Sequence, residues 1–237
     1  LIDAGASYRG MLTALNHCNI DIDAVKGVFI THEHSDHIKG LHQLQKQRAI
    51  PIYASPGTLE YLIHKKLVYS LDGLYEINDK PIQVADMEVK SFHTPHDCEE
   101  SLGYTIYTND DRKISVCTDL GEVTEEVADN IQGSDLCLIE SNYDEQMLKT
   151  NMNYPPFLKK RISSKVGHLS NTDSAEFIRT LVKTGTTRIV LGHLSQNNNF
   201  PSLASKKVLD KLDDFQLGKD FTLDVAPVSA SGMVIAL

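Results

Sequence analysis

One short polar segment, Thr31 to His37, limits what this chain can fold into more than any other feature. It directly follows Val28-Phe29-Ile30, an apolar run typical of a short buried strand, and it precedes apolar residues at helical spacing over residues 38–47. Four potential metal ligands fall within six residues of this junction, spaced His-x-His-x-Asp-His. They are His32, His34, Asp36 and His37. Such a cluster at the end of a buried strand predicts a metal site.

The geometry of this loop favours two ions over one. On an extended segment His32 and His34 point the same way, because residues two apart lie on one side of a strand. Asp36 and His37 turn toward a neighbouring point as the helix begins. One four-coordinate ion cannot comfortably take all four side chains from so short a loop. Imidazole and carboxylate suit zinc, manganese or iron better than calcium, so we expect two divalent ions of this kind.

The composition is that of an ordinary globular protein. Lysine and arginine number 23 against 32 acidic residues, a formal charge of −9 over 237 residues. This argues against a generic basic nucleic-acid coat but leaves room for a local basic groove. The four cysteines form no Cys-x-x-Cys pair, so we expect no disulfide framework and a reducing, cytoplasmic location. No stretch approaches the ~18 apolar residues of a membrane span, and we expect neither membrane association nor a protein partner.

Strand-like and helix-like segments alternate along the chain without a Gly/Ser linker. Two sheets with helices packed outside fit this order better than one doubly wound sheet. The expected strands lie at 28–30, 52–54, 87–92, 103–108, 113–118, 136–140, 188–191, 222–225 and 233–236. The expected helices lie at 38–47, from Gly57 to near Lys66, and at 123–132, 172–184 and 201–215. The pattern predicts an α/β protein.

The segment Thr31 to His37 resembles the signature of the metallo-β-lactamase fold, an αββα sandwich of two mixed sheets with helices outside and a dinuclear metal site. The resemblance implies one such domain over residues 1–237. It implies His96 as the third histidine of the first metal, Asp119 as a carboxylate bridging both ions, and His193 as the last histidine of the second. Each of the three follows an apolar strand, where side chains from different strands can converge.

This resemblance divides the ligands between two ions. The first takes His32, His34, His96 and Asp119, and the second takes Asp36, His37, Asp119 and His193. His93 lies three residues before His96 and could compete for the first ion. We expect His93 to be a buried supporting residue instead.

Two later stretches of sequence indicate which branch of this superfamily the chain resembles. Glu140 ends the strand 136–140, and Gly167-His168-Leu169-Ser170 opens a helix. The arrangement resembles tRNase Z-type and RNase J-type nucleases, and the chain as a whole looks closest to the YycJ/WalJ (VicX) family. The resemblance implies a metal-dependent phosphodiester hydrolase, an exonuclease of DNA or RNA that attacks with a metal-bridging hydroxide.

Three residues are expected to act in this reaction. Asp36 would orient the nucleophile, and His168 would protonate the leaving oxygen. Glu140 would hold His168 in the right tautomer, and the alternative for Glu140 is a structural cap of nearby backbone groups.

The beginning of the chain departs from the family pattern. Members of the YycJ/WalJ family start with a strand and a Gly/Ser/Asn-rich turn ahead of the segment that matches Leu1 to Gly5, and this sequence contains neither. We therefore expect the fold to lack its first strand in this chain, together with a loop that flanks the site. That loss bears directly on whether the chain is active.

A positive island directly before His168 favours a phosphate-bearing substrate. Between Gln146 and Thr172 the chain has five basic residues and no acid. They are Lys149, Lys159, Lys160, Arg161 and Lys165. Arg161 is the first choice for a phosphate contact, because a guanidinium binds phosphate in a bidentate manner. The other expected substrate contacts are Lys165, Asn171 and Ser195.

Two other classes of function stay open on the sequence alone. A small-molecule thioesterase or lactonase of the glyoxalase II type shares the dinuclear core, but it does not call for the helix-opening His168 or the basic run before it. A catalytically silent regulatory or scaffold protein is disfavoured, because every expected ligand is present. The donor set does not choose among zinc, manganese and iron.

Overall fold

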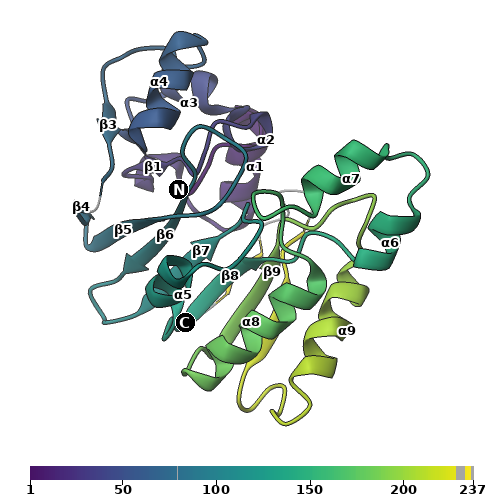
Figure 1. Ribbon diagram of the computed structural model, residues 1–237. Helices are drawn as coiled ribbons and strands as arrows, with labels where there is room; N and C mark the ends of the chain where they lie inside the picture. Colours follow the sequence, from purple (N-terminus) through teal and green to yellow (C-terminus); the bar gives the residue numbers. More distant parts are fainter. Residues whose placement is uncertain (79, 228–232, 236–237) are drawn as a thin grey trace. The chain divides into compact units, whose positions relative to one another are not determined.

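The computed structural model describes residues 1–78, 80–227 and 233–235 (Figure 1). The chain divides into two compact units. Unit 1 contains the described residues 1–78, 80–91, 98–102 and 233–235, and unit 2 contains residues 92–97 and 103–227. Every helix in the described part of the chain is too short or too polar to span a lipid bilayer.

Unit 1 is built around three short parallel strands. β2 lies between β1 and β3, with Val28 paired to Ile52 and Ile52 paired to Leu74. These strands alternate with helices, an order that favours parallel pairing. β4 and β5 form an antiparallel hairpin. The elements are α1 (Tyr8–His17), a 3₁₀ helix (Ile22–Ala24), β1 (Val28–Phe29), α2 (Ser35–Ile38), α3 (Leu41–Gln47), β2 (Ile52–Ala54), α4 (Pro56–His64), β3 (Leu74–Glu76), β4 (Ile82–Val84) and β5 (Met87–His93), whose last two residues belong to unit 2.

The helix expected over residues 38–47 begins at Ser35 and is divided into α2 and α3. Two glycines account for the division. The Gly40 N–H donates to the Ala4 carbonyl at 2.7 Å, and a Cβ on Gly40 would lie 2.1 Å from another carbonyl oxygen of the N-terminal segment. A Cβ on Gly5 would lie 1.8 Å from the carbonyl oxygen of Asp36. The N-terminal segment therefore packs against this helix at a backbone distance that only glycine permits.

Unit 2 is a mixed sheet covered by helices. The described strands of this unit lie in the order β10-β9-β8-β7-β6, where β6 and β7 pair antiparallel and the other neighbours pair parallel. Its core is formed by buried apolar side chains such as Cys117, Ile139, Ile178 and Leu191. The elements are β6 (Leu102–Tyr107), β7 (Lys113–Cys117), α5 (Glu125–Ile131), β8 (Leu136–Glu140), α6 (Glu145–Thr150), α7 (Pro156–Ile162), α8 (Asn171–Lys183), β9 (Arg188–Gly192), α9 (Pro201–Lys211) and β10 (Thr222–Val225).

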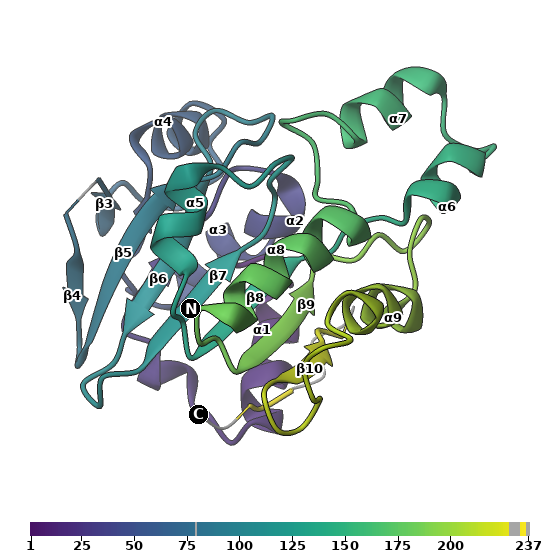
Figure 2. The same cartoon turned by 60° about the horizontal axis from the view of Figure 1, so that its bottom comes forward.

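Apart from the expected closing strand at 233–236, the strands and helices expected from the sequence are present, with ends that differ by a few residues. Residues 233–235 are not in a strand, and residue 236 lies outside the described residues. The helix expected over residues 201–215 ends at Lys211. The sequence patterns missed α1, α6 and α7 and did not identify β3 and β4. α7 has no buried residue and α6 has only Leu148, so neither short helix has the apolar periodicity that identifies a helix in a sequence. Both project from the sheet and helices of unit 2 (Figures 1 and 2).

Candidate metal centre

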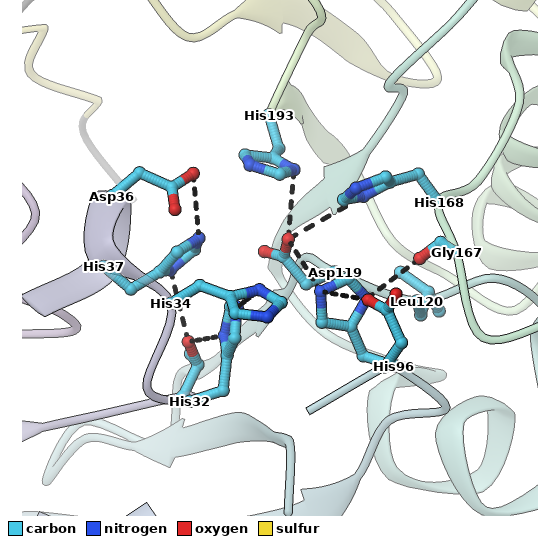
Figure 3. A network of polar contacts seen from close by, with 12 residues as sticks. His32, His34, Asp36, His37, His96, Asp119, Leu120, Gly167, His168 and His193 are labelled. Carbon is cyan, nitrogen blue, oxygen red and sulfur yellow. Dashed lines mark hydrogen bonds and ion pairs between the residues drawn. The ribbon is translucent and has the colours of Figure 1, made fainter. Parts of the chain in front are cut away.

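The loop after β1 carries the expected ligands of unit 1 (Figure 3). His32 is fully buried, and its Nε2 lies 3.0 Å from Nδ1 of His34. The ring centroids of His32 and His37 are 4.2 Å apart. Nε2 of His37 lies 3.7 Å from the carboxylate of Asp36, which is largely exposed. Unit 1 therefore gathers the side chains of the His-x-His-x-Asp-His segment.

Asp3 holds this loop, and the sequence patterns did not indicate it. Its Oδ2 accepts hydrogen bonds from Nδ1 of His37 (2.7 Å) and from the Thr31 hydroxyl (2.9 Å), and its Oδ1 accepts one from the Thr31 N–H (2.8 Å). Because a carboxylate can only accept, Nδ1 of His37 carries the proton and Nε2 keeps the lone pair that a metal needs. The available signal was an acid directly after the strand-like run Leu1-Ile2.

Three residues of unit 2 lie at the ends of neighbouring parallel strands. Asp119 follows β7 by two residues, Glu140 ends β8, and His193 directly follows β9. The carboxyl ends of parallel strands meet at one edge of a sheet, so these side chains converge. One ligand atom from each of Asp119, Glu140, His168 and His193 lies within 4.8 Å of the others.

Glu140 is the centre of the unit 2 cluster. It is fully buried, and its Oε1 accepts from Nδ1 of His168 (2.9 Å) and of His193 (2.7 Å). Its Oε2 accepts the N–H groups of Leu120 (3.1 Å) and Leu169 (2.9 Å). Burial alone would raise the pKa of Glu140, but the two histidines hold this pKa well below its usual range. The sequence left two alternative roles for Glu140. The carboxylate has both, because it orients a histidine and also caps backbone N–H groups.

His168 is held by this carboxylate and remains partly exposed. Burial favours the neutral ring, but the hydrogen bond to Glu140 outweighs burial and raises the pKa of His168 above its usual value. The side chain is 23% exposed. An imidazole that is fixed at Nδ1 and has a raised pKa is suited to proton donation.

His96 tests whether the unit 2 donor set fits a cation. Its Nδ1 donates to the Gly167 carbonyl at 2.9 Å, and burial lowers its pKa, so the ring is neutral with a lone pair on Nε2. That Nε2 lies 3.6 Å from Oδ1 of Asp97 and 3.8 Å from Oδ1 of Asp119. A lone pair that faces two carboxylates is repelled by them, and a bound cation relieves that repulsion. The residues present therefore fit a divalent ion.

His93 is not a buried supporting residue, and that expectation was wrong. Its side chain is 54% exposed at the end of β5, where Nδ1 lies 3.3 Å from the carboxylate of Glu126. The side chain of His96, by contrast, is only 1% exposed and lies beside Asp119. Burial beside a carboxylate favours His96 over His93 as a ligand.

Three residues of the two clusters have left-handed backbone conformations. The φ angles are +54° at Asp3, +58° at Asp119 and +55° at His193. Residues other than glycine adopt this region rarely, at a cost of roughly 1–3 kcal/mol each, and such residues concentrate at functional sites. In unit 2 this conformation accompanies a distance of 3.3 Å between Nδ1 of His193 and Oδ1 of Asp119.

The two basic residues expected to contact substrate are engaged in ion pairs. Arg161 pairs with Asp97, which lies next to His96 in the sequence. Nζ of Lys165 lies 2.8 Å from the carboxylate of Glu122. Both pairs are solvent-exposed and link α7 and the segment after it to other loops of unit 2.

Asn171 has a structural role in place of the expected substrate contact. It is fully buried, its Oδ1 accepts from the Ser141 hydroxyl (2.7 Å), and its Nδ2 donates to Oδ1 of Asn199 (2.9 Å). A buried amide with a partner at each end is not accessible to substrate. Ser195 is partly exposed, and its hydroxyl accepts the Asn198 N–H at 3.2 Å.

Comparison with known proteins places the chain in a family. The family model described as "Beta-lactamase superfamily domain" matches residues 1–194. Exodeoxyribonuclease YycJ of Bacillus anthracis is 34% identical over 233 residues, which cover 94% of this chain and 85% of that protein. Exodeoxyribonuclease WalJ of Streptococcus pneumoniae serotype 2 is 33% identical over 238 residues, covering 98% and 87% respectively.

A solved structure confirms the fold. Zn²⁺-bound PqqB from Methylobacterium extorquens matches with a TM-score of 0.73 at 18% identity, over 100% of this chain and 82% of that one. The α/β class with two sheets and helices agrees with the fold expected from the resemblance. The chain therefore belongs to the β-lactamase superfamily, with the metallo-β-lactamase fold, and within it to the YycJ/WalJ family.

Proposed function

We propose that this chain is a metal-dependent phosphodiester hydrolase that degrades DNA from an end. The identity of 33–34% to two proteins named exodeoxyribonuclease, over more than four-fifths of their length, carries the proposal. The histidine and carboxylate clusters of the two units supply the donor types that such hydrolysis needs. These names favour DNA over RNA, and they give no support to a thioesterase or lactonase.

Two divalent ions complete the proposed centre, with zinc or manganese ahead of iron. One would be held by His32, His34, His96 and Asp119, and the other by Asp36, His37, Asp119 and His193. When bound, such ions polarise a phosphoryl oxygen and lower the pKa of a bound water. Because the proposed ligands come from both units, we propose that residues 1–237 act as a single domain.

The chain's own residues orient the reactants and move a proton. Asp36, an exposed carboxylate beside His37, orients the attacking water. Glu140 accepts a hydrogen bond from the protonated Nδ1 of His168. The other ring nitrogen, Nε2, is then the proton donor to the leaving oxygen. Ser195, two residues after His193 and partly exposed, is the proposed polar contact to substrate.

A cytoplasmic location is part of the proposal. Cys18, Cys117 and Cys137 are free thiols, and Cys117 and Cys137 are fully buried. Burial raises the pKa of the Cys137 thiol to about 12, which keeps that thiol protonated and unreactive. Free thiols without a disulfide framework suit a reducing compartment.

Asp3→Asn should weaken metal binding without unfolding the protein. Asparagine adopts the left-handed conformation of position 3 and keeps an oxygen that accepts a hydrogen bond from Thr31. Its uncharged amide holds the ring of His37 less strongly than the carboxylate does. We expect the metal dissociation constant, measured by competition with a chelator, to rise by about 10- to 100-fold. Asp72→Asn, an exposed site in unit 1, is the charge-matched control. Equal metal affinity in both variants would contradict a role for Asp3 in holding His37.

The proposed activity is tested with metal-loaded protein on end-labelled linear DNA, linear RNA, circular single-stranded DNA and a thioester. We expect linear DNA to be shortened from an end, circular DNA to remain intact, and EDTA to stop the reaction. Thioester turnover without cleavage of any nucleic acid would overturn the proposal in favour of the glyoxalase II-type alternative.

A further inference from the structure

Residues 146–166 of unit 2, called the arm from here on, project from the sheet and its covering helices (Figures 1 and 2). The arm contains most of α6 and all of α7, and it ends two residues before His168. Two of its large apolar side chains are exposed, Met152 by 97% and Phe157 by 74%. The exposed ring of Phe157 is therefore open to stacking by a flat group of another molecule.

Polar residues fasten the first half of the arm to the loop after His193. Nδ2 of Asn151 donates to Oδ1 of Asn198 at 2.7 Å. Nδ2 of Asn197 donates to the hydroxyl of Tyr154 at 3.2 Å. Both partners lie within five residues of His193, so this half of the arm has a defined position next to a proposed metal ligand.

Charged residues fasten the second half of the arm to two more loops of unit 2. Arg161 forms an ion pair with Asp97, in the loop after β5 that carries a proposed ligand. Lys165 pairs with Glu122 at 2.8 Å, in the loop that follows β7. The arm is thus connected to all three unit 2 loops that supply proposed ligands.

Two glycines bring the base of the arm against the backbone of these loops. A Cβ on Gly121 would lie 2.3 Å from the carbonyl carbon of Lys165, and a Cβ on Gly167 would lie 2.2 Å from the carbonyl oxygen of Ile162. The His168 N–H donates to the same Ile162 carbonyl at 2.8 Å. The base of the arm therefore has a fixed position relative to His168, the proposed proton donor.

These contacts separate the five cations of the arm into two groups. Arg161 and Lys165 are in ion pairs, and Nζ of Lys159 donates to the carbonyl of Lys149 at 2.7 Å, which ties α7 to α6. Lys149 and Lys160 have exposed side chains, and neither forms an ion pair among the described residues. The exposed groups of the arm thus include two ammonium ions outside ion pairs, one aromatic ring and one thioether, and the arm contains no acid.

We propose that the arm binds the single-stranded end of the DNA substrate, with the ring of Phe157 stacked on a base and with Lys149 and Lys160 against phosphates. The inference rests on the proposed function and names the element that guides the strand to the metal centre. Stacking on an exposed aromatic ring combined with cations along the backbone is how proteins hold single strands without reading sequence. Arg161 and Lys165 then position the arm rather than contact the substrate.

Charge and size favour DNA over a membrane as the occupant. The chain carries a net charge of −9, and a cationic segment without acids is the part of it that attracts a polyanion. α7 has only seven residues, about two turns, which is little apolar area to insert into a bilayer. One exposed ring is sufficient to stack on one base.

The test is the affinity of metal-loaded protein for a short single-stranded phosphorothioate oligonucleotide, which resists cleavage, measured by fluorescence anisotropy. Phe157→Ala and Lys160→Glu should each weaken binding by about tenfold. Phe157→Trp should retain wild-type affinity. Lys219→Glu, the same charge change at an exposed lysine in the turn before β10, is the matched control and should also bind normally. Hydrolysis of bis(p-nitrophenyl) phosphate, which has no further nucleotides to place on the arm, should be unchanged in Lys219→Glu.

The outcomes separate the arm from the proposed activity. Unchanged oligonucleotide affinity in Phe157→Ala and Lys160→Glu would overturn the arm proposal. Loss of binding to phosphatidylglycerol vesicles with intact DNA binding would overturn it in favour of a membrane contact. If the wild type hydrolyses neither DNA nor the small diester while these two variants still lose oligonucleotide affinity, the proposed function fails and the arm proposal stands.

Discussion

Replacing Asp119 with asparagine is expected to remove both metal ions and to abolish DNA degradation. Oδ1 of Asp119 lies 3.3 Å from a nitrogen of His193 and 3.8 Å from nitrogens of His96 and His168, so this carboxylate is the common neighbour of three imidazoles. An amide has no charge to bridge two cations. Metal content by inductively coupled plasma mass spectrometry should fall from about two ions per chain toward zero, and kcat/KM should fall by at least about 10³-fold.

The matched control for this variant is Asp129→Asn, which removes the same charge from an exposed position on α5. It should keep its metal and its activity. Asp119→Asn that retained a full complement of metal would contradict the bridging role. Circular dichroism of both variants separates loss of metal from loss of fold, because Asp119 is buried and asparagine is close to it in size.

His168→Ala is expected to lower kcat on DNA by about 10²- to 10⁴-fold while metal content stays at the wild-type level. The deoxyribose oxygen that leaves is strongly basic and needs a proton, and His168 is the imidazole that Glu140 holds with a raised pKa. The p-nitrophenolate ion leaves without protonation. Hydrolysis of bis(p-nitrophenyl) phosphate by His168→Ala should therefore fall far less than cleavage of DNA.

His93→Ala is the matched control for this second prediction. His93 is exposed beside Glu126, so its removal should change neither metal content nor kcat. Loss of metal from His168→Ala would identify His168 as a ligand, a role that its position within 4.8 Å of ligand atoms of Asp119 and His193 makes chemically feasible. An equal fall on both substrates would likewise contradict proton donation.

Most elements of the fold were predictable because their burial imposes a periodic pattern. β7, β8 and β9 are apolar runs in the core, and α8 carries a continuous buried face, so residue type and structure agree there. α7 buries no residue, and nothing in its own sequence required a helix. The break between α2 and α3 was not predictable either, because it depends on the N-terminal segment packing against Gly40.

The clusters of the candidate site were predictable in membership more than in arrangement. Asp119 and His193 were expected from the resemblance to the metallo-β-lactamase fold, and each lies just after a strand as that resemblance implies. Asp3 was missed because a single aspartate after a two-residue apolar run has no distinguishing pattern. Its role depends on His37, 34 residues away in the chain.

By itself the sequence determined that the imidazoles and carboxylate of residues 32–37 directly follow a buried strand, because such a cluster is a local property of the chain. The ligands expected farther along the chain came from the resemblance to a known family. Only the tertiary structure decided which charged side chains form ion pairs with distant residues and which lie on the surface outside such pairs. Arg161 and Asp97 are 64 residues apart, and Lys165 and Glu122 are 43 apart, so no local pattern distinguishes these paired cations from Lys160. Pairing between distant charges exists only once the strands have brought their loops together, and that pairing determines which cations remain available to a substrate.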